Sequence, residues 1–181
     1  MGLSIIIVVA RGSNSYLKHM AIVQQVTRPA ECGRPGEEAR RSGCHYDFIS
    51  GAFVYPECHD KELEEEFLVL RDWKWFADEE MEREVTVDEV RRDGGPNPLY
   101  VSIEYHDAHC AYTWKKLHRA IIRRTKIDSQ IGSIHHTMHC SDTVFRNRSA
   151  DPQLSRFGHK STFCLDPRDA SEADGKEDFH R

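Results

Sequence analysis

Two copies of one short motif constrain this sequence of 181 residues more than any other feature. His106-Asp107-Ala108-His109-Cys110 and His136-Thr137-Met138-His139-Cys140 each contain a histidine, a second histidine three residues later and a cysteine four residues later. On an α-helix these positions share one face. Each motif therefore presents two imidazoles and one thiol in the same direction, and the fold must provide that face with a partner.

The first motif lies in the clearest periodic segment of the chain, between Leu99 and Arg123. Core-facing residues recur there every three or four positions, which indicates an α-helix. They are Leu99, Ile103, His106, Cys110, Thr113, Leu117 and Ile121. His109 is expected at the edge of this stripe. The second motif is predicted on a shorter helix with Ser133 as its N-cap, after a loop that follows Lys126.

Buried histidines need partners, because an unpaired polar group in an apolar site costs about 1 to 3 kcal/mol. A shared metal ion would satisfy all the imidazoles if the two helices pack face to face. Several histidines without an obvious carboxylate favour copper, before zinc or iron. His118 and His135 are expected outside the site, because they are rotated away from these faces. The predicted catalytic residues are His106, His109, His136 and His139. The predicted metal ligands are the same four histidines with Cys110 and Cys140.

The six cysteines leave the redox compartment open. They are Cys32, Cys44, Cys58, Cys110, Cys140 and Cys164. No CxxC pair is present. Three disulfides would fit an oxidising lumen, and free thiols or metal ligands would fit a reducing cytosol. For Cys110 and Cys140, a disulfide or thiol role is favoured over ligation of a metal. The sequon Asn147-Arg148-Ser149 is compatible with secretion.

Local signals predict the elements that precede these helices. A short charged helix is expected to end at Gly43, and the aromatic segment 46–56 is expected as extended chain against the core. Asp60 is a predicted N-cap for a helix with one apolar stripe and one solvated face of glutamates. The stripe is Leu63, Phe67 and Leu70, and the glutamates are Glu62, Glu64, Glu65 and Glu66.

Aromatic and capping residues characterise the middle of the chain. Trp73, Trp75 and Phe76 are predicted to pack in the core, because such rings bury much apolar area, with a substrate platform as the alternative. Thr86-Val87-Asp88-Glu89 has the form of a capping box. It predicts a short helix that runs to about Arg92 and ends at Gly94 and Gly95.

These elements predict one small, mainly α-helical domain with a few short strands, in which the two HxxHC helices face each other. Residues 1–30 form an N-terminal extension, residues 31–147 the domain, and residues 148–181 a polar C-terminal tail that is expected to be disordered. The apolar stub Leu3–Ala10 is interpreted as a short buried strand, a weak targeting signal or the product of a truncation.

Charge and hydropathy exclude two classes of function. Lys and Arg number 25 against 30 Asp and Glu, a net charge of −5, so the basic excess of a nucleic-acid-binding protein is absent. The longest apolar run, Ile5–Ala10, is far shorter than the roughly 18 residues of a membrane-spanning helix. We therefore expect no nucleic-acid partner and no transmembrane helix in this sequence.

The motif residues and their surroundings resemble the UstYa family of fungal oxidases. The resemblance covers about Glu31 to Cys140, and the paired HxxHC motif is its most specific part. The matching segments around the motifs are Tyr105–Ala120, Ile127–Ser129 and His136–Cys140. The matching segments upstream are Glu31–Gly33, Glu38–Arg40, Gly43–Cys44, Tyr46–Phe48, Pro56–Cys58 and Glu65–Leu68.

The resemblance implies a tailoring enzyme of fungal secondary metabolism, often in mycotoxin or cyclic-peptide pathways. Members are associated with oxidative cyclisation, and some with hydroxylation, desaturation or halogenation, and copper dependence has been proposed. The implied partner is a small-molecule or peptide substrate, and the implied assembly is a homo- or hetero-oligomer with related oxidases. The four motif histidines, His106, His109, His136 and His139, would form the active centre.

The sequence departs from the family at its N-terminus. Relatives commonly begin with a transmembrane helix, whereas only the stub Leu3–Ala10 precedes the domain here. The enzyme is therefore expected either to be soluble or to have an incomplete N-terminus, and the resemblance alone implies a secretory-lumen or membrane-associated location. Two other functions stay open: a structural zinc-binding module that clamps the two helices, and an inactive accessory subunit of a related oxidase.

Overall fold

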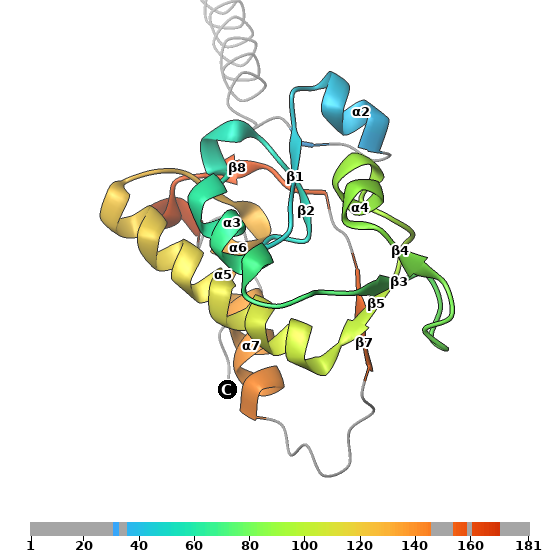
Figure 1. Cartoon of the computed structure of the whole chain (residues 1–181). Coiled ribbons are helices and arrows are strands. Elements are labelled where there is room, and N and C mark those ends of the chain that lie inside the picture. The colour runs from blue at the N-terminus through green and yellow to red at the C-terminus, as the bar shows by residue number, and fades with distance from the viewer. Residues whose placement is uncertain (1–30, 33–35, 146–153, 159–160, 171–181) are drawn as a thin grey trace, which may run out of the picture. The chain divides into compact units, whose positions relative to one another are not determined.

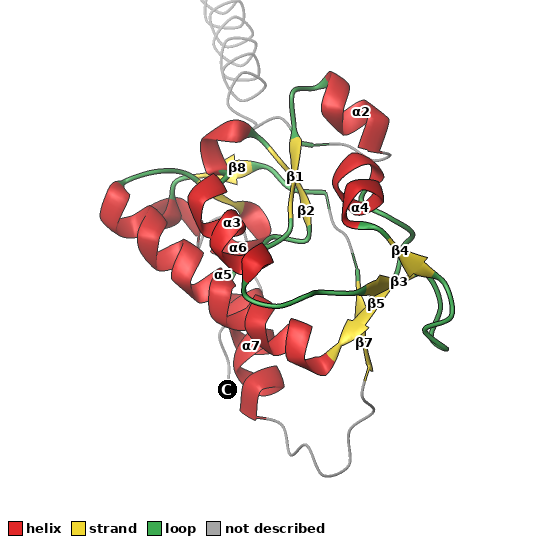
Figure 2. Ribbon diagram, in the orientation of Figure 1, coloured by secondary structure: helices red, strands yellow, loops and turns green. Residues whose placement is uncertain are grey.

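Figure 1 shows the computed structural model of the chain, which describes residues 31–32, 36–145, 154–158 and 161–170. Helices dominate these residues and the strands are short (Figure 2), which confirms the predicted mainly α-helical fold class. The described residues belong to one compact unit. The predicted extension 1–30, its apolar stub and the sequon at Asn147 lie outside the described residues.

The helices occur along the whole described segment, and two of them are longer than the others. They are α2 (Gly36–Arg41), η1 (Pro56–Cys58), α3 (Lys61–Val69), α4 (Val87–Asp93), α5 (Ile103–Arg123), α6 (Ser129–Gly132), α7 (Ile134–Phe145) and η3 (Pro167–Asp169). The long helices α5 and α7 carry the two motifs. Helix α2 agrees with the charged helix predicted before Gly43.

The strands of the described residues form three small antiparallel sheets. The strands are β1 (His45–Asp47), β2 (Ala52–Val54), β3 (Trp75–Phe76), β4 (Glu84–Val85), β5 (Leu99–Ser102), β6 (Ile127–Asp128), β7 (Leu154–Phe157) and β8 (Cys164–Leu165). The largest sheet has the order β4-β3-β5-β7, and β1–β2 and β6–β8 form the two pairs. Strand β7 is an outer strand of its sheet, and β5 leads directly into α5 (Figure 2).

Helix-capping chemistry is confirmed where its signal is local. The side chain of Thr86 accepts a hydrogen bond from the N–H of Glu89, the reciprocal bond is present, and α4 ends at Gly94 in the left-handed conformation with φ +78°. Such a C-cap favours glycine because it has no Cβ. Helix α7 begins directly after Ser133, as predicted.

Two predicted boundaries were wrong. Residues Leu99–Ser102 are strand β5 instead of the first turn of a helix, because Leu99 and Val101 alternate inward and the side chain of Ser102 caps α5 by accepting from Tyr105 N at 3.1 Å. The segment predicted as a loop after Lys126 contains β6 and α6. Asp128 caps α6 by accepting from Ile131 N at 3.0 Å.

The aromatic segment 46–56, predicted as one extended run, folds back as the β1–β2 hairpin. The carboxylate of Asp47 accepts the backbone N–H groups of Ile49 at 2.8 Å and Ser50 at 3.0 Å, which fixes the turn. Gly51 follows with φ +62°. Within the segment, only residues 46–47 and 52–54 are therefore strand.

The core is aromatic and surrounds Tyr105 at the start of α5. Its ring lies 5.5 Å from that of Phe67, 5.3 Å from Trp73, 5.7 Å from Trp75 and 5.6 Å from Phe157, between centroids. Trp73 and Trp75 are buried, which confirms their predicted packing role, whereas Phe76 is only half-buried. These contacts fix the N-terminal part of α5, where the first motif lies.

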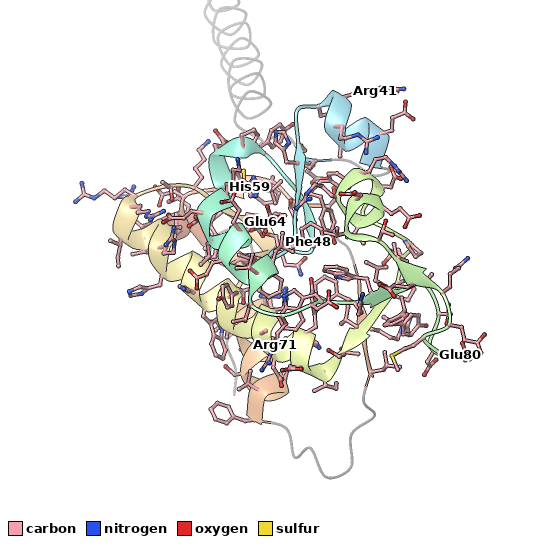
Figure 3. The ribbon with its side chains drawn as sticks, viewed as in Figure 1. Arg41, Phe48, His59, Glu64, Arg71 and Glu80 are labelled. Atoms are coloured by element: carbon pink, nitrogen blue, oxygen red, sulfur yellow. A yellow bond between two sulfur atoms is a disulfide. The ribbon has the colours of Figure 1, made fainter. Side chains whose placement is uncertain are left out.

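The predicted solvated face of α3 was wrong for Glu64, which is only 5% exposed. Its carboxylate accepts the N–H of Phe48 at 2.9 Å and lies 3.0 Å from Nε2 of His59 (Figure 3). Burial alone would lower the pKa of His59, but the hydrogen bond with Glu64 and the charges of Asp47 and Glu64 together raise it. The two predicted stripes also end early, because Leu70 and Ile121 are about half exposed.

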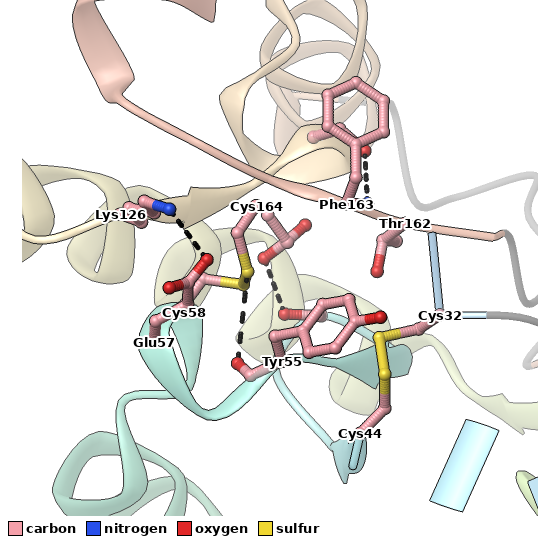
Figure 4. The surroundings of a disulfide bond; sticks show 12 residues. Cys32, Cys44, Tyr55, Glu57, Cys58, Lys126, Thr162, Phe163 and Cys164 are labelled. Carbon is pink, nitrogen blue, oxygen red and sulfur yellow. Dashed lines mark hydrogen bonds and ion pairs between the residues drawn. A yellow bond between two sulfur atoms is a disulfide. The ribbon is translucent and has the colours of Figure 1, made fainter. Parts of the chain in front are cut away.

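Residues 154–158 and 161–170 belong to the fold, where we predicted a polar tail from residue 148. Strand β7 pairs with β5 over four residue pairs, and β8 pairs with β6. A disulfide joins Cys58 to Cys164, and another joins Cys32 to Cys44 (Figure 4). These long-range connections outweigh the polar composition of the segment. Within the described residues, none of the helices combines the length and apolar character needed to cross a bilayer.

Candidate metal centre

The two motifs meet where α5 packs against α7. The Nε2 atoms of His106 and His139 are 3.3 Å apart, and their ring centroids are separated by 5.3 Å. The rings of His109 and His136 are separated by 5.5 Å. Within each helix, the ring centroids are 5.9 Å apart on α5 and 6.3 Å apart on α7. The structure thus brings together all four histidines that the sequence singles out.

The donor atoms fit the requirements of a metal ion in two groups. Two nitrogens about 2.0–2.1 Å from one tetrahedral ion lie about 3.3–3.4 Å apart, and the Nε2 atoms of His106 and His139 have a separation of 3.3 Å. The second group is His109, His136 and Cys140, whose donor atoms all lie within 4.8 Å of one another. Sγ of Cys140 is 4.0 Å from Nδ1 of His136. A nitrogen-rich donor set with one sulfur suits copper or zinc.

His109 is the most deeply buried of the four histidines, with 2% of its surface exposed. It was predicted at the edge of the stripe, but the ring of Phe157 from β7 covers it at 4.8 Å. Burial, followed by the nearby His136, His106 and His139, holds the pKa of His109 well below its usual value. Its Nδ1 has no hydrogen bond of ordinary geometry within the described residues. A neutral, buried imidazole retains the lone pair that a metal requires.

Ser155 orients the ring of His106 through the nitrogen that does not face His139. Its Oγ lies 2.6 Å from Nδ1 of His106, which directs Nε2 of that ring toward His139. Hydrogen bonds of this kind select the nitrogen that a histidine offers to a metal. Ser155 and Phe157 come from β7, in the segment that we predicted as a tail. The sequence contains no motif that would have revealed them.

Cys110 and Cys140 are both buried and are free thiols, so the third disulfide that the sequence allowed is not formed. The neighbouring Cys110 thiol, followed by His136 and Thr113, lowers the pKa of Cys140 to about 5 against the effect of burial. Cys140 and burial raise the pKa of Cys110. Sγ of Cys140 faces His136, so Cys140 is the better candidate of the two thiols for a metal.

A cavity of about 460 Å³ opens beside the rings. Helix α6 contributes polar side chains to its wall, and β7 and the segment after it contribute an aromatic and polar wall. The lining residues are His106, His109, Ser129, Gln130, Ser133, His136, His139, Arg156, Phe157, Gly158, Ser161 and Phe163. His118 and His135 are exposed and do not line it. All four motif histidines therefore line one cavity.

A buried ion network supports the corner between α5 and α6. Nζ of Lys116 lies 2.6 Å from Oδ2 of Asp47, 3.0 Å from Oδ2 of Asp128 and 2.7 Å from Oγ of Ser50. Burial alone would lower the pKa of Lys116, but the two carboxylates raise it. Burial alone would raise the pKa of Asp128, but Lys116 lowers it. Sequence reasoning missed this network, because a lysine in a helix normally faces water.

Comparison with known proteins shows that the chain is similar to two fungal biosynthetic-cluster proteins. They are the phomopsin biosynthesis cluster proteins B and B′ of Diaporthe leptostromiformis, and each is 26% identical over 125 residues. The alignment covers 64% of this chain and 36% of each relative, so the chain spans about a third of their length. No family model matches the chain, and no solved structure matches it.

Proposed function

We propose that the chain is a tailoring oxidase of fungal secondary metabolism whose reaction takes place at a copper ion between α5 and α7. The observation that carries the proposal is the convergence of the two HxxHC motifs on one cavity. The similarity to proteins named for a phomopsin biosynthesis cluster supports the pathway class. The resemblance to UstYa oxidases supports oxidative cyclisation or a related C–H oxidation.

The five donor residues form two groups. His109, His136 and Cys140 would bind the ion, and His106 and His139 would line the cavity beside it as a second pair of nitrogens. Copper supplies the redox chemistry that protein side chains lack.

The surrounding residues orient the ligands and limit water. Ser155 holds His106 in one orientation through Nδ1, and Phe157 covers His109. The neighbouring Cys110 thiol lowers the pKa of Cys140, which favours the form of Cys140 that binds a metal. The described residues thus supply a preorganised set of donors next to a cavity that admits a substrate.

A structural zinc site is the second candidate function, and the buried thiolate and imidazoles of Cys140, His109 and His136 favour it, since zinc is commonly bound by such sets. Structural zinc sites are closed, whereas these histidines line an open cavity of about 460 Å³. In addition, an aromatic core and two disulfides stabilise the chain independently of a metal. These features favour catalysis.

Metal binding and oxygen uptake test the proposal. The purified full chain is titrated with copper, and oxygen uptake is measured with ascorbate as electron donor, with the zinc-loaded protein as blank. His109→Ala should abolish stoichiometric copper binding and oxygen uptake, because it removes the buried ligand. His118→Ala is the matched control, since His118 is an exposed histidine of the same helix.

Three results would contradict the proposal. Copper binding and oxygen uptake of His109→Ala at the parent level would show that the ion is bound elsewhere. Equal losses in His118→Ala would show that the effect is not specific to the site. Unfolding of the parent by a chelator, followed by circular dichroism, would support the structural zinc site, because an oxidase of this fold should stay folded without metal.

A further inference from the structure

A second cavity adjoins the one beside the histidines. It has a volume of about 410 Å³ and is lined by Asn97, Pro98, Arg156 and Gly158. Arg156 and Gly158 also line the histidine cavity. The walls of the two cavities therefore meet at Arg156 and Gly158.

Arg156 differs in charge from everything else that lines these two cavities. Among the described lining residues, it is the one with a fixed charge, since the others are imidazole, hydroxyl, amide, aromatic or aliphatic groups. No described Asp or Glu lies within ion-pair distance of its guanidinium, in contrast to Arg119, Arg123 and Arg168. An arginine is always protonated, so the wall of both cavities carries a positive charge.

The position of Arg156 in β7 explains how one side chain reaches both cavities. Successive side chains of a strand point to opposite faces, and Ser155 and Phe157 point toward the histidine rings. Arg156 thus begins on the other face of β7. Strand β7 is an outer strand of its sheet in the described part of the chain, and Arg156 is exposed there and lines both cavities. Pairing with β5 holds the backbone, with Arg156 opposite Tyr100.

We propose that Arg156 binds a carboxylate of the substrate and thereby sets which part of the molecule lies over the histidines. A guanidinium matches a carboxylate with two parallel hydrogen bonds, so the contact fixes direction as well as position. The substrate class is an organic acid, such as a peptide with a free carboxylate, that is long enough to extend from the histidine rings to Arg156. The inference depends on the proposed function only for the reaction that would follow binding. Binding of the acid itself requires no metal.

Binding of a matched pair of probes to the metal-free full chain tests this inference. The probes are an acetylated tetrapeptide with a free C-terminal carboxylate and the same peptide as its C-terminal amide. Binding is followed by NMR through the imidazole signals of His106 and His139. We expect the acid to bind about three- to tenfold more tightly than the amide, the range of a partly exposed ion pair, and the preference to weaken with added salt.

Two variants locate the preference. Arg156→Gln should abolish the difference between acid and amide, and Arg156→Lys should retain part of it. Arg41→Gln should leave it unchanged, since Arg41 is an exposed arginine on α2 (Figure 3). Equal binding of the two probes, absence of binding by either, or a preference that survives in Arg156→Gln would overturn the inference. Stronger competition by phenyl phosphate than by benzoate would overturn the carboxylate assignment.

The same experiments separate the inference from the proposed function. Loss of the acid preference in Arg156→Gln with normal copper binding supports the inference whatever the outcome of the oxygen-uptake assay. Normal oxygen uptake without any acid preference would support the oxidase and refute the role of Arg156.

Discussion

Replacement of Lys116 by methionine tests the buried network that supports the site. Nζ of Lys116 lies 2.6 Å from Asp47 and 3.0 Å from Asp128, and all three side chains are almost completely buried. Methionine keeps most of the apolar stem but leaves two buried carboxylates without a counter-ion. Removal of one partner of a buried ion pair costs about 3–5 kcal/mol, a large part of the roughly 5–15 kcal/mol that stabilises a typical domain.

Urea denaturation of the disulfide-intact chain measures this loss. With an m-value of about 2 kcal/mol/M, the midpoint of Lys116→Met should fall by about 1.5–2.5 M. Lys115→Met is the matched control, because the neighbouring Lys115 is half-exposed and pairs with Glu66 on the surface. That variant should lose less than about 1 kcal/mol.

The pH dependence has a defined sign. The pKa of Lys116 is raised above its usual 10.5 by Asp47 and Asp128 against the effect of burial, so its contribution is complete below pH 10.5 and is lost as pH rises through the raised value. The pKa of Asp128 is lowered below its usual 3.8 by Lys116 against the effect of burial. The contribution of Asp128 to the free energy of unfolding is present above pH 3.8 and is lost as pH falls through its lowered pKa.

The difference in the free energy of unfolding between the parent and Lys116→Met should therefore be largest between about pH 3.8 and pH 10.5. It should shrink in acid, where protonation neutralises the carboxylates that the variant leaves unpaired. Asp128→Asn in the Lys116→Met background should recover part of the stability, because it removes one unpaired charge. A midpoint of Lys116→Met equal to that of Lys115→Met would refute the reasoning.

Two further substitutions test how the C-terminal segment is held against the site. Gly51→Ala should cost about 1–3 kcal/mol and shift the NMR signals of His109, since a Cβ on Gly51 would lie 2.3 Å from the Phe157 ring at a φ of +62°; unchanged stability and unchanged signals would contradict this contact. Replacement of Cys58 and Cys164 by alanine should cost about 2–5 kcal/mol, because the disulfide joins residues 106 positions apart. A calorimetric Tm equal to that of the parent would contradict a stabilising role.

Features with a local cause could be predicted from the sequence. The capping box of Thr86 and Glu89 and the glycine end of α4 depend on residues a few positions apart, and both are present. The convergence of the motifs has a similar basis, because positions i, i+3 and i+4 share one helix face in any α-helix. The convergence also requires that α5 and α7 pack against each other. The buried residues on both helices agree with this packing.

Features that depend on distant partners could not be predicted. Glu64 was expected in water, and Lys116 was given no role, because burial of a charge is costly unless a partner compensates for it. Their partners lie elsewhere in the chain: Asp47 is 69 positions from Lys116, and Phe48 is 16 positions from Glu64. Spacing within a helix contains no information about such contacts.

Strand β7 illustrates the same limit at the site. Its four residues are too few for a periodic signal, and their polar neighbours indicated a tail. Pairing with β5 nevertheless places Ser155 and Phe157 against the rings of His106 and His109. The motifs therefore predicted the imidazoles but only part of their surroundings.

The contribution of β7 to the site has a practical consequence for the expression of related proteins. A gene product that stops shortly after Cys140 would satisfy every motif search, yet it would lack the surface on which His106 and His109 rest. A shortened protein with boundaries chosen from the motifs alone would contain both motif helices but lack strand β7. Boundaries for such proteins should include the equivalents of Ser155, Phe157 and the disulfide partner Cys164.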